Sequence, residues 1–212
     1  YRNTSVKYFP LGETNFESLI EELEKAKHFI FMEYFIIKQG EMWDMVLQTL
    51  ARKAKDGVDV RLIYDDVGCA MWLPSRFLHE MEELGIKVAT FNPIVPLLNL
   101  RQNNRDHRKI TVIDGHTGFT GGINLADEYI NKVSPFGHWK DTGIMLKGDA
   151  VWNLTLMFLQ TWKMLTKEED NYLQYTPMKH KNTPFLSDGY IQPYGDTPVD
   201  DDDDLGYEEF DF

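Results

Sequence analysis

Residues 29–37 read Phe-Ile-Phe-Met-Glu-Tyr-Phe-Ile-Ile, a run of aromatic and aliphatic side chains interrupted only by the charged Glu33. An apolar run this short is typical of a strand that is buried on both faces. Strands of that kind occur in parallel sheets that carry helices on each side. The run therefore indicates an α/β protein before any other part of the chain is considered.

The segments that surround this run alternate between helical and strand-like patterns. Apolar residues at helical spacing predict a helix over residues 14–27, which begins with a capping box formed by Thr14 and Glu17. Two further helix-and-strand pairs are predicted: residues 43–54 with 58–64, and residues 77–84 with 86–91. This alternation predicts a layered α/β fold in which a largely parallel or mixed sheet is flanked by helices.

The second half of the chain predicts shorter elements around a tight turn. Asp114-Gly115 separates two strand-like stretches, residues 109–113 and 116–120, and predicts a β-hairpin. The other predicted elements are a short helix over residues 125–130, a strand over 142–147 and an amphipathic helix over 151–165. The sequence shows no internal repeat.

The formal charge of -12 comes mostly from one end of the chain. Residues 183–212 contain ten acidic residues and no Lys or Arg, so residues 1–182 are close to neutral. Within the acidic end, Asp200–Asp204 is a run of like charges that we expect to be solvated and flexible. The overall acidity therefore says little about a substrate.

Cysteine content and hydropathy exclude several classes of protein. The single Cys69 excludes an internal disulfide and a cluster of thiolate metal ligands. The most apolar stretches, residues 29–37 and 151–165, are interrupted by polar residues and fall short of the ~18 apolar residues that a membrane span needs. The chain starts with Tyr1 and shows no signal-peptide pattern, so we expect it to begin inside a longer gene product.

His107 and Lys109 are the first candidates for chemistry. Side chains at positions i and i+2 of an extended segment emerge on the same face, so the imidazole and the ammonium group can address one phosphate together. We interpret His107 as a nucleophile toward phosphorus and Lys109 as the stabiliser of charge on the phosphoryl oxygens. The simpler alternative is a surface histidine beside a solvated lysine.

A second candidate is the sequence Gly121-Gly122-Ile123-Asn124. Backbone without side chains can approach an anion closely, and amides at the start of a helix point toward negative charge. The pattern predicts that Gly121 and Gly122 bind a phosphate and that Asn124 donates to a phosphoryl oxygen. A double glycine after a strand is also typical of a simple turn.

These elements together resemble a known signature. The motif H-x-K-x4-D that starts at His107, followed by G-G-x-N from Gly121, is similar to the signature of the phospholipase D superfamily. Residues 91–110 and 188–196 narrow the resemblance to bacterial cardiolipin synthases, and it extends over about residues 8–198.

The resemblance implies a phospholipase D-like fold and a metal-free reaction without cofactors. In that family the motif histidine forms a covalent phosphatidyl intermediate. Asp141, which follows Trp139-Lys140, is implied to orient this histidine. Asp114 is grouped with the catalytic residues because it completes the motif, although its place in a hairpin turn indicates a structural role.

Two acidic residues are further implied to lie near the catalytic cleft, namely Glu33 and Asp65. An unpaired carboxylate inside an apolar run is costly to bury, so Glu33 requires a partner. Lys109 and Arg108 are the candidates for this supporting role.

The chain departs from that family because it carries one such motif, where the family members carry two. We therefore predict a catalytic half-domain over residues 1–182, followed by the start of a second half and an acidic tail over 183–212. The implied partners are the anionic phospholipid phosphatidylglycerol and either a second half or a second copy that completes the site. The implied location is the cytoplasmic side of a bacterial cell membrane, reached through amino-terminal segments that this sequence lacks, with this chain itself soluble.

Three functions stay open. The first is one half of a cardiolipin synthase that is weakly active or inactive alone. The second is a homodimeric phosphodiesterase or nuclease, although nucleic acid is not expected as a partner of a near-neutral domain. The apolar residues 94–100 suit a lipid better, and a segment of the protein core is the equal alternative for them. The third is a non-catalytic domain that binds phosphate or anionic head groups.

Overall fold

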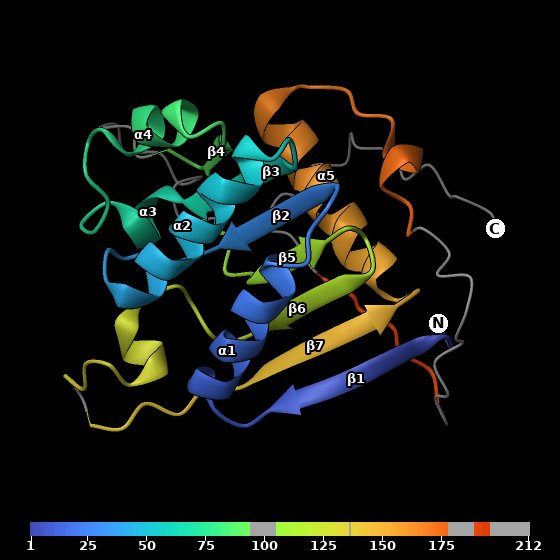
Figure 1. The fold of residues 1–212 in the computed structure, drawn as a ribbon, viewed down its shortest axis with the longest axis horizontal. Coiled ribbons are helices and arrows are strands. Elements are labelled where there is room, and N and C mark those ends of the chain that lie inside the picture. Colours follow the sequence, from blue (N-terminus) through green and yellow to red (C-terminus); the bar gives the residue numbers. More distant parts are fainter. Residues whose placement is uncertain (94–104, 136, 178–188, 196–212) are drawn as a thin grey trace.

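The computed structural model describes residues 1–93, 105–135, 137–177 and 189–195 (Figure 1). These residues form a mixed sheet of seven strands in the order β1-β7-β6-β5-β2-β3-β4. The strands are β1 (Thr4–Phe9), β2 (Phe29–Tyr34), β3 (Asp59–Asp65), β4 (Lys87–Phe91), β5 (Ile110–Ile113), β6 (Thr117–Gly121) and β7 (Gly143–Gly148). The helices are α1 (Gly12–Leu23), α2 (Glu41–Lys55), α3 (Asp66–Cys69), α4 (Phe77–Glu83), α5 (Val151–Thr166), and the 3-10 helices η2 (Asp127–Ile130) and η3 (Tyr172–Tyr175).

Parallel pairing is confined to one side of the sheet. β2 pairs with β3, and β3 with β4, in parallel. β5, β6, β7 and β1 run antiparallel to their neighbours. The predicted mixed sheet flanked by helices is confirmed. Its parallel pairs lie where strands alternate with helices, and the tight turn between β5 and β6 requires those two strands to be antiparallel.

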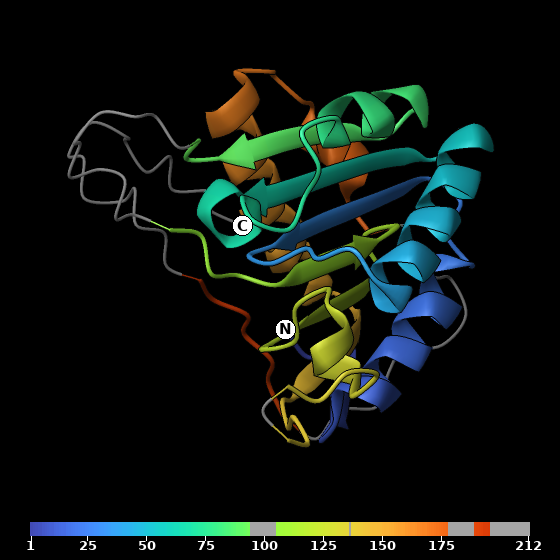
Figure 2. The ribbon, with the colours of Figure 1, turned by 90° about the vertical axis from the view of Figure 1, so that its left-hand side faces the viewer.

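Helices cover both faces of the sheet (Figures 1 and 2). Helices α1, α2 and α4 pack on one face and α5 packs on the other. Every residue of β2 is buried. Phe31 stacks on Phe158 of α5 with a centroid distance of 4.6 Å, whereas Met32 packs into the core on the opposite face. The apolar run therefore forms the doubly covered strand that it predicts.

The predicted hairpin between β5 and β6 is confirmed. Its turn residues Asp114 and Gly115 both have positive φ, at 52° and 65°. That backbone geometry is the reason for an Asp-Gly pair, because it matches the twist of the flanking strands.

Three details differ from the sequence prediction. Helix α1 has Leu11 as its N-cap, and the Thr14 hydroxyl donates to the carbonyl oxygen of Leu11 at 3.1 Å, so the predicted capping box is wrong. The short helix predicted over residues 125–130 is the single 3-10 turn η2. Edge strand β1 was not predicted, because the polar Ser5 and Lys7 interrupt the apolar run that marks a buried strand.

Some expectations fall outside the described ranges. The apolar residues 94–100 and most of residues 183–212, including the acidic run, are not described, and the predicted domain division stays a prediction. Within the described ranges, no helix has both the length and the hydropathy to cross a membrane.

Candidate active site at the start of strand β5

His107 and Lys109 lie immediately before β5, at the edge of the sheet where the parallel strands β2 and β3 end. β5 runs antiparallel to β2, and its first residue Ile110 faces Glu33 near the carboxyl end of β2. Open α/β sheets bind ligands outside the carboxyl ends of their strands. The motif histidine and lysine therefore lie where the fold favours a site.

The two motif side chains meet at Phe35. The His107 ring lies 4.8 Å from the Phe35 ring, centroid to centroid, and the Lys109 Nζ lies 5.3 Å from the same centroid. This shared contact confirms that positions i and i+2 project on one face.

His107 and Lys109 differ in their exposure. His107 is exposed, although part of its ring is shielded from water. This partial burial and the positive charge of Lys109 both lower the pKa of His107, which favours the neutral imidazole at physiological pH. Lys109 is buried, and its ammonium donates to the carbonyl oxygen of His107. Burial lowers the pKa of Lys109 to about 8, and nearby carboxylates only partly offset that effect.

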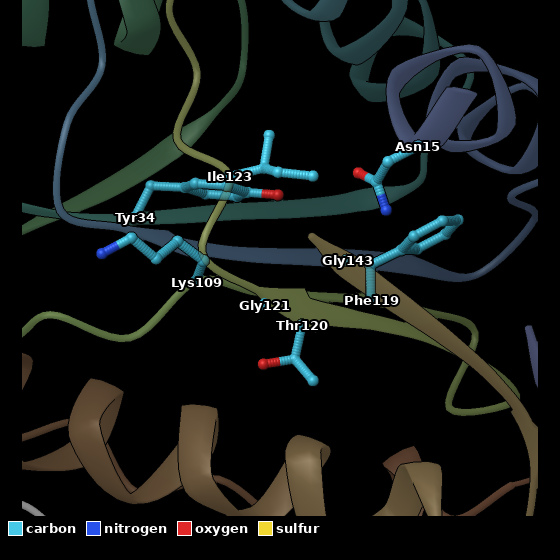
Figure 3. Close-up of a pocket in the computed structure, with 8 residues that line it drawn as sticks. All are labelled: Asn15, Tyr34, Lys109, Phe119, Thr120, Gly121, Ile123 and Gly143. Atoms are coloured by element: carbon cyan, nitrogen blue, oxygen red, sulfur yellow. The ribbon is translucent and has the colours of Figure 1, made fainter. Parts of the chain in front are cut away.

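The stem of Lys109 also lines a small pocket (Figure 3). Figure 3 shows Lys109 and Tyr34 at one end and Asn15 at the other, with the Lys109 ammonium pointing away from Asn15. The cavity measures about 10 Å³, which is the room of a single water molecule. A phosphate group does not fit in this cavity, so the accessible side of the motif is the exposed side of His107.

Asp141 lies beside Gly122, where an added Cβ would clash with the Asp141 carboxylate. The negative charge of Asp141 counteracts the lowered pKa of His107 and of Lys109, so it acts within electrostatic range of both. Among the described contacts, its hydrogen bond runs to the Thr142 N–H at 2.8 Å, not to the His107 ring. An orienting role for Asp141 stays a prediction.

The phosphate-binding role of Gly121 and Gly122 stays a prediction, and the sheet engages one of the two amides. The Gly122 N–H donates to the carbonyl oxygen of Thr142 at 3.0 Å, and Gly121 pairs with Gly143 in the sheet. Gly121 has φ +148°, and a Cβ there would clash with the carbonyl oxygen of Thr142. These glycines allow β6 and β7 to approach closely, and the Gly122 N–H is used within the sheet.

Asn124 is buried, and its amide holds the local backbone. Its Oδ1 accepts the Ile36 N–H at 3.0 Å, and its Nδ2 donates to the Tyr129 hydroxyl at 2.8 Å. One N–H of Nδ2 is engaged in that bond, so the amide has a second N–H to offer. Tyr129 was not singled out from the sequence, because only the fold brings it to Asn124.

Asp114 is located at the opposite end of β5. Its carboxylate accepts the backbone N–H groups of Lys27, His28 and Phe29 at 2.8–2.9 Å, which secures the start of β2. The catalytic grouping of Asp114 is therefore corrected, and its role is the structural one that the hairpin turn indicates.

Glu33, Asp65 and Arg108 lie close to the motif. Glu33 is fully buried, and its Oε1 lies 2.8 Å from Nη2 of Arg108, so its partner is Arg108 and not Lys109. Asp65 accepts the backbone N–H of Asp106 at 3.1 Å. The buried Asp106 was missed in the sequence, although its place next to His107 was a signal.

The described part of the chain holds no group of three or more His, Cys, Asp or Glu side chains that could bind a metal ion.

A match to a protein-family model covers this site. Residues 19–134 match the model described as "Cardiolipin synthase, PLD-like domain", which includes more than half of the chain together with His107 and Lys109. The chain belongs to this family. The expected resemblance to bacterial cardiolipin synthases is therefore confirmed.

Curated relatives support the family. The chain is 43% identical to a cardiolipin synthase of Geobacillus kaustophilus over 74% of its length, and 40% identical to cardiolipin synthase 2 of Bacillus anthracis over 78%. It is 46% identical to an uncharacterised protein of Streptococcus mutans over 94%. The chain spans only 31%, 32% and 43% of these three relatives.

Solved structures support the fold. NucT from Helicobacter pylori is similar over 77% of this chain and 96% of its own, with a TM-score of 0.57 at 13% identity. Nuc from Salmonella typhimurium, a phospholipase D family member, is similar over 77% of this chain and 93% of its own, with a TM-score of 0.53 at 20% identity. The phospholipase D-like fold is thus shown.

Proposed function

We propose that this chain is one catalytic half of a cardiolipin synthase, which transfers a phosphatidyl group from one phosphatidylglycerol to another and releases glycerol. The observation that carries the proposal is the exposed His107, whose lowered pKa favours the neutral ring, beside the buried ammonium of Lys109 in a chain of this family. A neutral imidazole is the form that can attack phosphorus.

The reaction proceeds in two displacements. A ring nitrogen of His107 attacks phosphorus, the bond from phosphorus to the glycerol head-group oxygen breaks, and that oxygen takes a proton from a general acid. A hydroxyl group of the second phosphatidylglycerol then attacks the phosphohistidine and gives its proton back to the same group. The products are cardiolipin and glycerol, and His107 is free again.

The general acid comes from a second catalytic half or a second copy, because this sequence holds a single H-x-K-x4-D motif. Lys109 stabilises the negative charge on the phosphoryl oxygens during both displacements, and its burial strengthens that interaction. The second N–H of Asn124 is available to a phosphoryl oxygen. In the substrate complex, a ring N–H of His107 donates a hydrogen bond to the Asp141 carboxylate, which orients the ring.

An exposed apolar surface next to the motif supports a lipid substrate. Val67, Met71 and Trp72 are exposed at helix α3 and the loop that follows it. Helix α3 packs against Phe35, whose ring contacts His107. Tryptophan and apolar side chains at one edge favour the interface of a membrane. We propose that this is the bacterial cell membrane, on the cytoplasmic side that the resemblance to cardiolipin synthases implies.

The test is cardiolipin formation from phosphatidylglycerol in detergent micelles with a chelator present, comparing the chain with His107→Ala. Product that disappears in the variant supports the proposal and means that two copies can assemble a site. Equal product from both proteins overturns it. Product from neither means that transfer requires the second half, and a covalent adduct on His107 is then the quantity to measure.

A homodimeric phosphodiesterase or nuclease is the second candidate, favoured by the fold shared with NucT and Nuc over almost the whole of those chains. The net charge of residues 1–182 is close to zero, which argues against nucleic-acid binding. This candidate would be favoured if the chain forms a dimer in analytical ultracentrifugation and that dimer binds single-stranded DNA at low salt. A head group retained equally by the chain and by His107→Ala, with no adduct, would instead favour a non-catalytic binding domain.

A further inference from the structure

His107 lies in a segment that the backbone of the sheet does not hold. The pairing of β5 with β2 begins at Ile110 opposite Glu33, and residues 105–109 have no regular secondary structure. Without a ladder of backbone hydrogen bonds, the position of this segment depends on side chains.

The residues on either side of His107 are fixed on the face that α5 covers. The carboxylate of Asp106 accepts the Arg108 backbone N–H and the guanidinium Nε, each at 3.0 Å. Arg108 Nη2 donates to Thr161 Oγ1 of α5 at 2.7 Å. Because alternate residues of an extended segment point to opposite faces, fixing Asp106 and Arg108 turns His107 and Lys109 toward the other face.

Glu33 lies next to Arg108, and its buried carboxyl oxygens lack hydrogen-bond donors in the described part of the chain. Its side chain is fully buried, with Oε1 2.8 Å from Arg108 Nη2, yet neither oxygen has a hydrogen bond of normal geometry from a donor in the described residues. Two buried carboxylates beside one guanidinium hold an excess of negative charge, which is relieved when one carboxyl keeps a proton.

We propose that Glu33 is a positioning residue for His107, which as a neutral carboxylic acid donates a hydrogen bond to Asp106 and so fixes the segment that carries the nucleophile. The inference rests on the proposed function only in calling His107 the nucleophile. It goes beyond that function because it assigns a bound proton and a positioning role to Glu33, which does not touch the substrate.

The pKa shifts of Glu33 and Asp106 agree with a proton on Glu33. Burial, followed by the negative charge of Asp106, raises the pKa of Glu33 well above its usual range. Burial alone would raise the pKa of Asp106 too, but hydrogen bonds from Glu33 and Arg108 outweigh it and keep that pKa low. The proton therefore resides on Glu33.

Other elements supply the remaining charged neighbours of the pair. Asp65 in β3 accepts the Asp106 N–H, and Arg105 lies 3.5 Å from Asp65, while α5 contributes the neutral Thr161. The pKa of Glu33 is raised in the folded chain. The contribution of this carboxyl group to the stability of the fold is therefore fully present below the pKa that Glu33 has in the unfolded chain. That contribution is lost as the pH rises through the folded pKa. The segment around His107 should loosen as the pH rises through the folded pKa of Glu33.

The test follows three nuclear magnetic resonance signals in the chain: the ¹³C shift of the Glu33 carboxyl, the titration of the His107 ring, and amide exchange at residues 106 and 108. Glu33→Gln keeps a neutral hydrogen-bond donor, and Glu33→Ala removes it. Met32→Ala is the matched control, because Met32 is equally buried in the same strand on the opposite face.

We expect a protonated Glu33 carboxyl at pH 7, and a normal His107 titration with slow amide exchange in Glu33→Gln. In Glu33→Ala the two amides should exchange at least about tenfold faster and the His107 titration should move, whereas Met32→Ala should leave both unchanged. An ionised Glu33 at pH 7, or a Gln variant that behaves like the Ala variant, would overturn the proposal. None of these signals needs turnover, so a failed proposed function would show separately, as the lack of a His107 adduct.

Discussion

The two ends of strand β5 carry parts of one sequence motif and have opposite physical characters. At the start, His107 is exposed and the buried ammonium of Lys109 has a pKa lowered to about 8. At the end, Asp114 accepts three backbone N–H groups from residues 27–29. The first end holds a cation that burial disfavours, whereas the carboxylate at the second end accepts hydrogen bonds from three backbone amides.

This difference separates residues that serve chemistry from residues that serve the fold. A buried cation costs stability and is retained where it stabilises a reacting group, while a carboxylate bonded to three amides stabilises the chain. Substitutions at the two ends should therefore change activity and stability in opposite ways.

The largest effect should follow from His107→Ala. Loss of the nucleophile should lower phosphatidyl transfer by about 10³-fold or more, with little change in the midpoint of thermal unfolding, because the ring is exposed. Product formation and thermal unfolding of the same sample measure the two quantities. Substantial residual transfer would place the nucleophile elsewhere.

Lys109→Met should separate activity from stability most clearly. We expect transfer to fall by about 10²-fold to 10³-fold, because the charge on the phosphoryl oxygens loses its partner. Removing a cation that burial disfavours should raise the free energy of unfolding by about 1–3 kcal/mol. Urea unfolding checks the second effect, and a less stable variant would contradict it.

Asp114→Ala should show the reverse behaviour. Three backbone N–H groups lose their acceptor, so the free energy of unfolding should fall by about 2–4 kcal/mol. Transfer per folded molecule should stay close to that of the unchanged chain. Asp114→Asn, which keeps an acceptor oxygen and tolerates positive φ, is the control and should lose less stability. A catalytic defect in folded Asp114→Ala would remove the distinction between the two ends.

The smallest effect is a pH dependence that only the first end should show. The Lys109 cation is lost as the pH rises through about 8, so kcat/KM should fall by up to about tenfold per unit above that value. Between about pH 8 and the pKa of an unfolded lysine, the unfolded chain binds the extra proton, so this group makes the fold more stable as the pH rises. Lys109→Arg should shift the fall in kcat/KM to higher pH. A profile that stays flat to pH 10 would contradict the lowered pKa.

Patterns that are local in the sequence predicted much of the fold. The apolar run of β2 and the Asp-Gly turn depend on neighbouring residues, and so does the shared face of His107 and Lys109. The edge strand β1 could not be predicted, because it is defined by pairing with β7 from the far end of the chain.

Interactions between distant segments account for what the sequence left out of the site. The Gly122 N–H donates to Thr142 because β7 returns beside β6, which no local pattern reveals. The sequence showed that Glu33 needed a basic partner but not that Asp106 would lie beside it. Burial of several charges in one place is a property of the folded chain.

The central claim is that His107 is the nucleophile, and a phosphatidyl ester with a 4-nitrophenolate leaving group tests it most directly. This leaving group departs without a proton, so the chain alone should attack even if the second half supplies the general acid. We predict a burst of about one nitrophenolate per chain and a phosphatidyl adduct on the His107 peptide, both absent in His107→Ala. A burst that persists in the variant, or an adduct on another residue, would contradict the account.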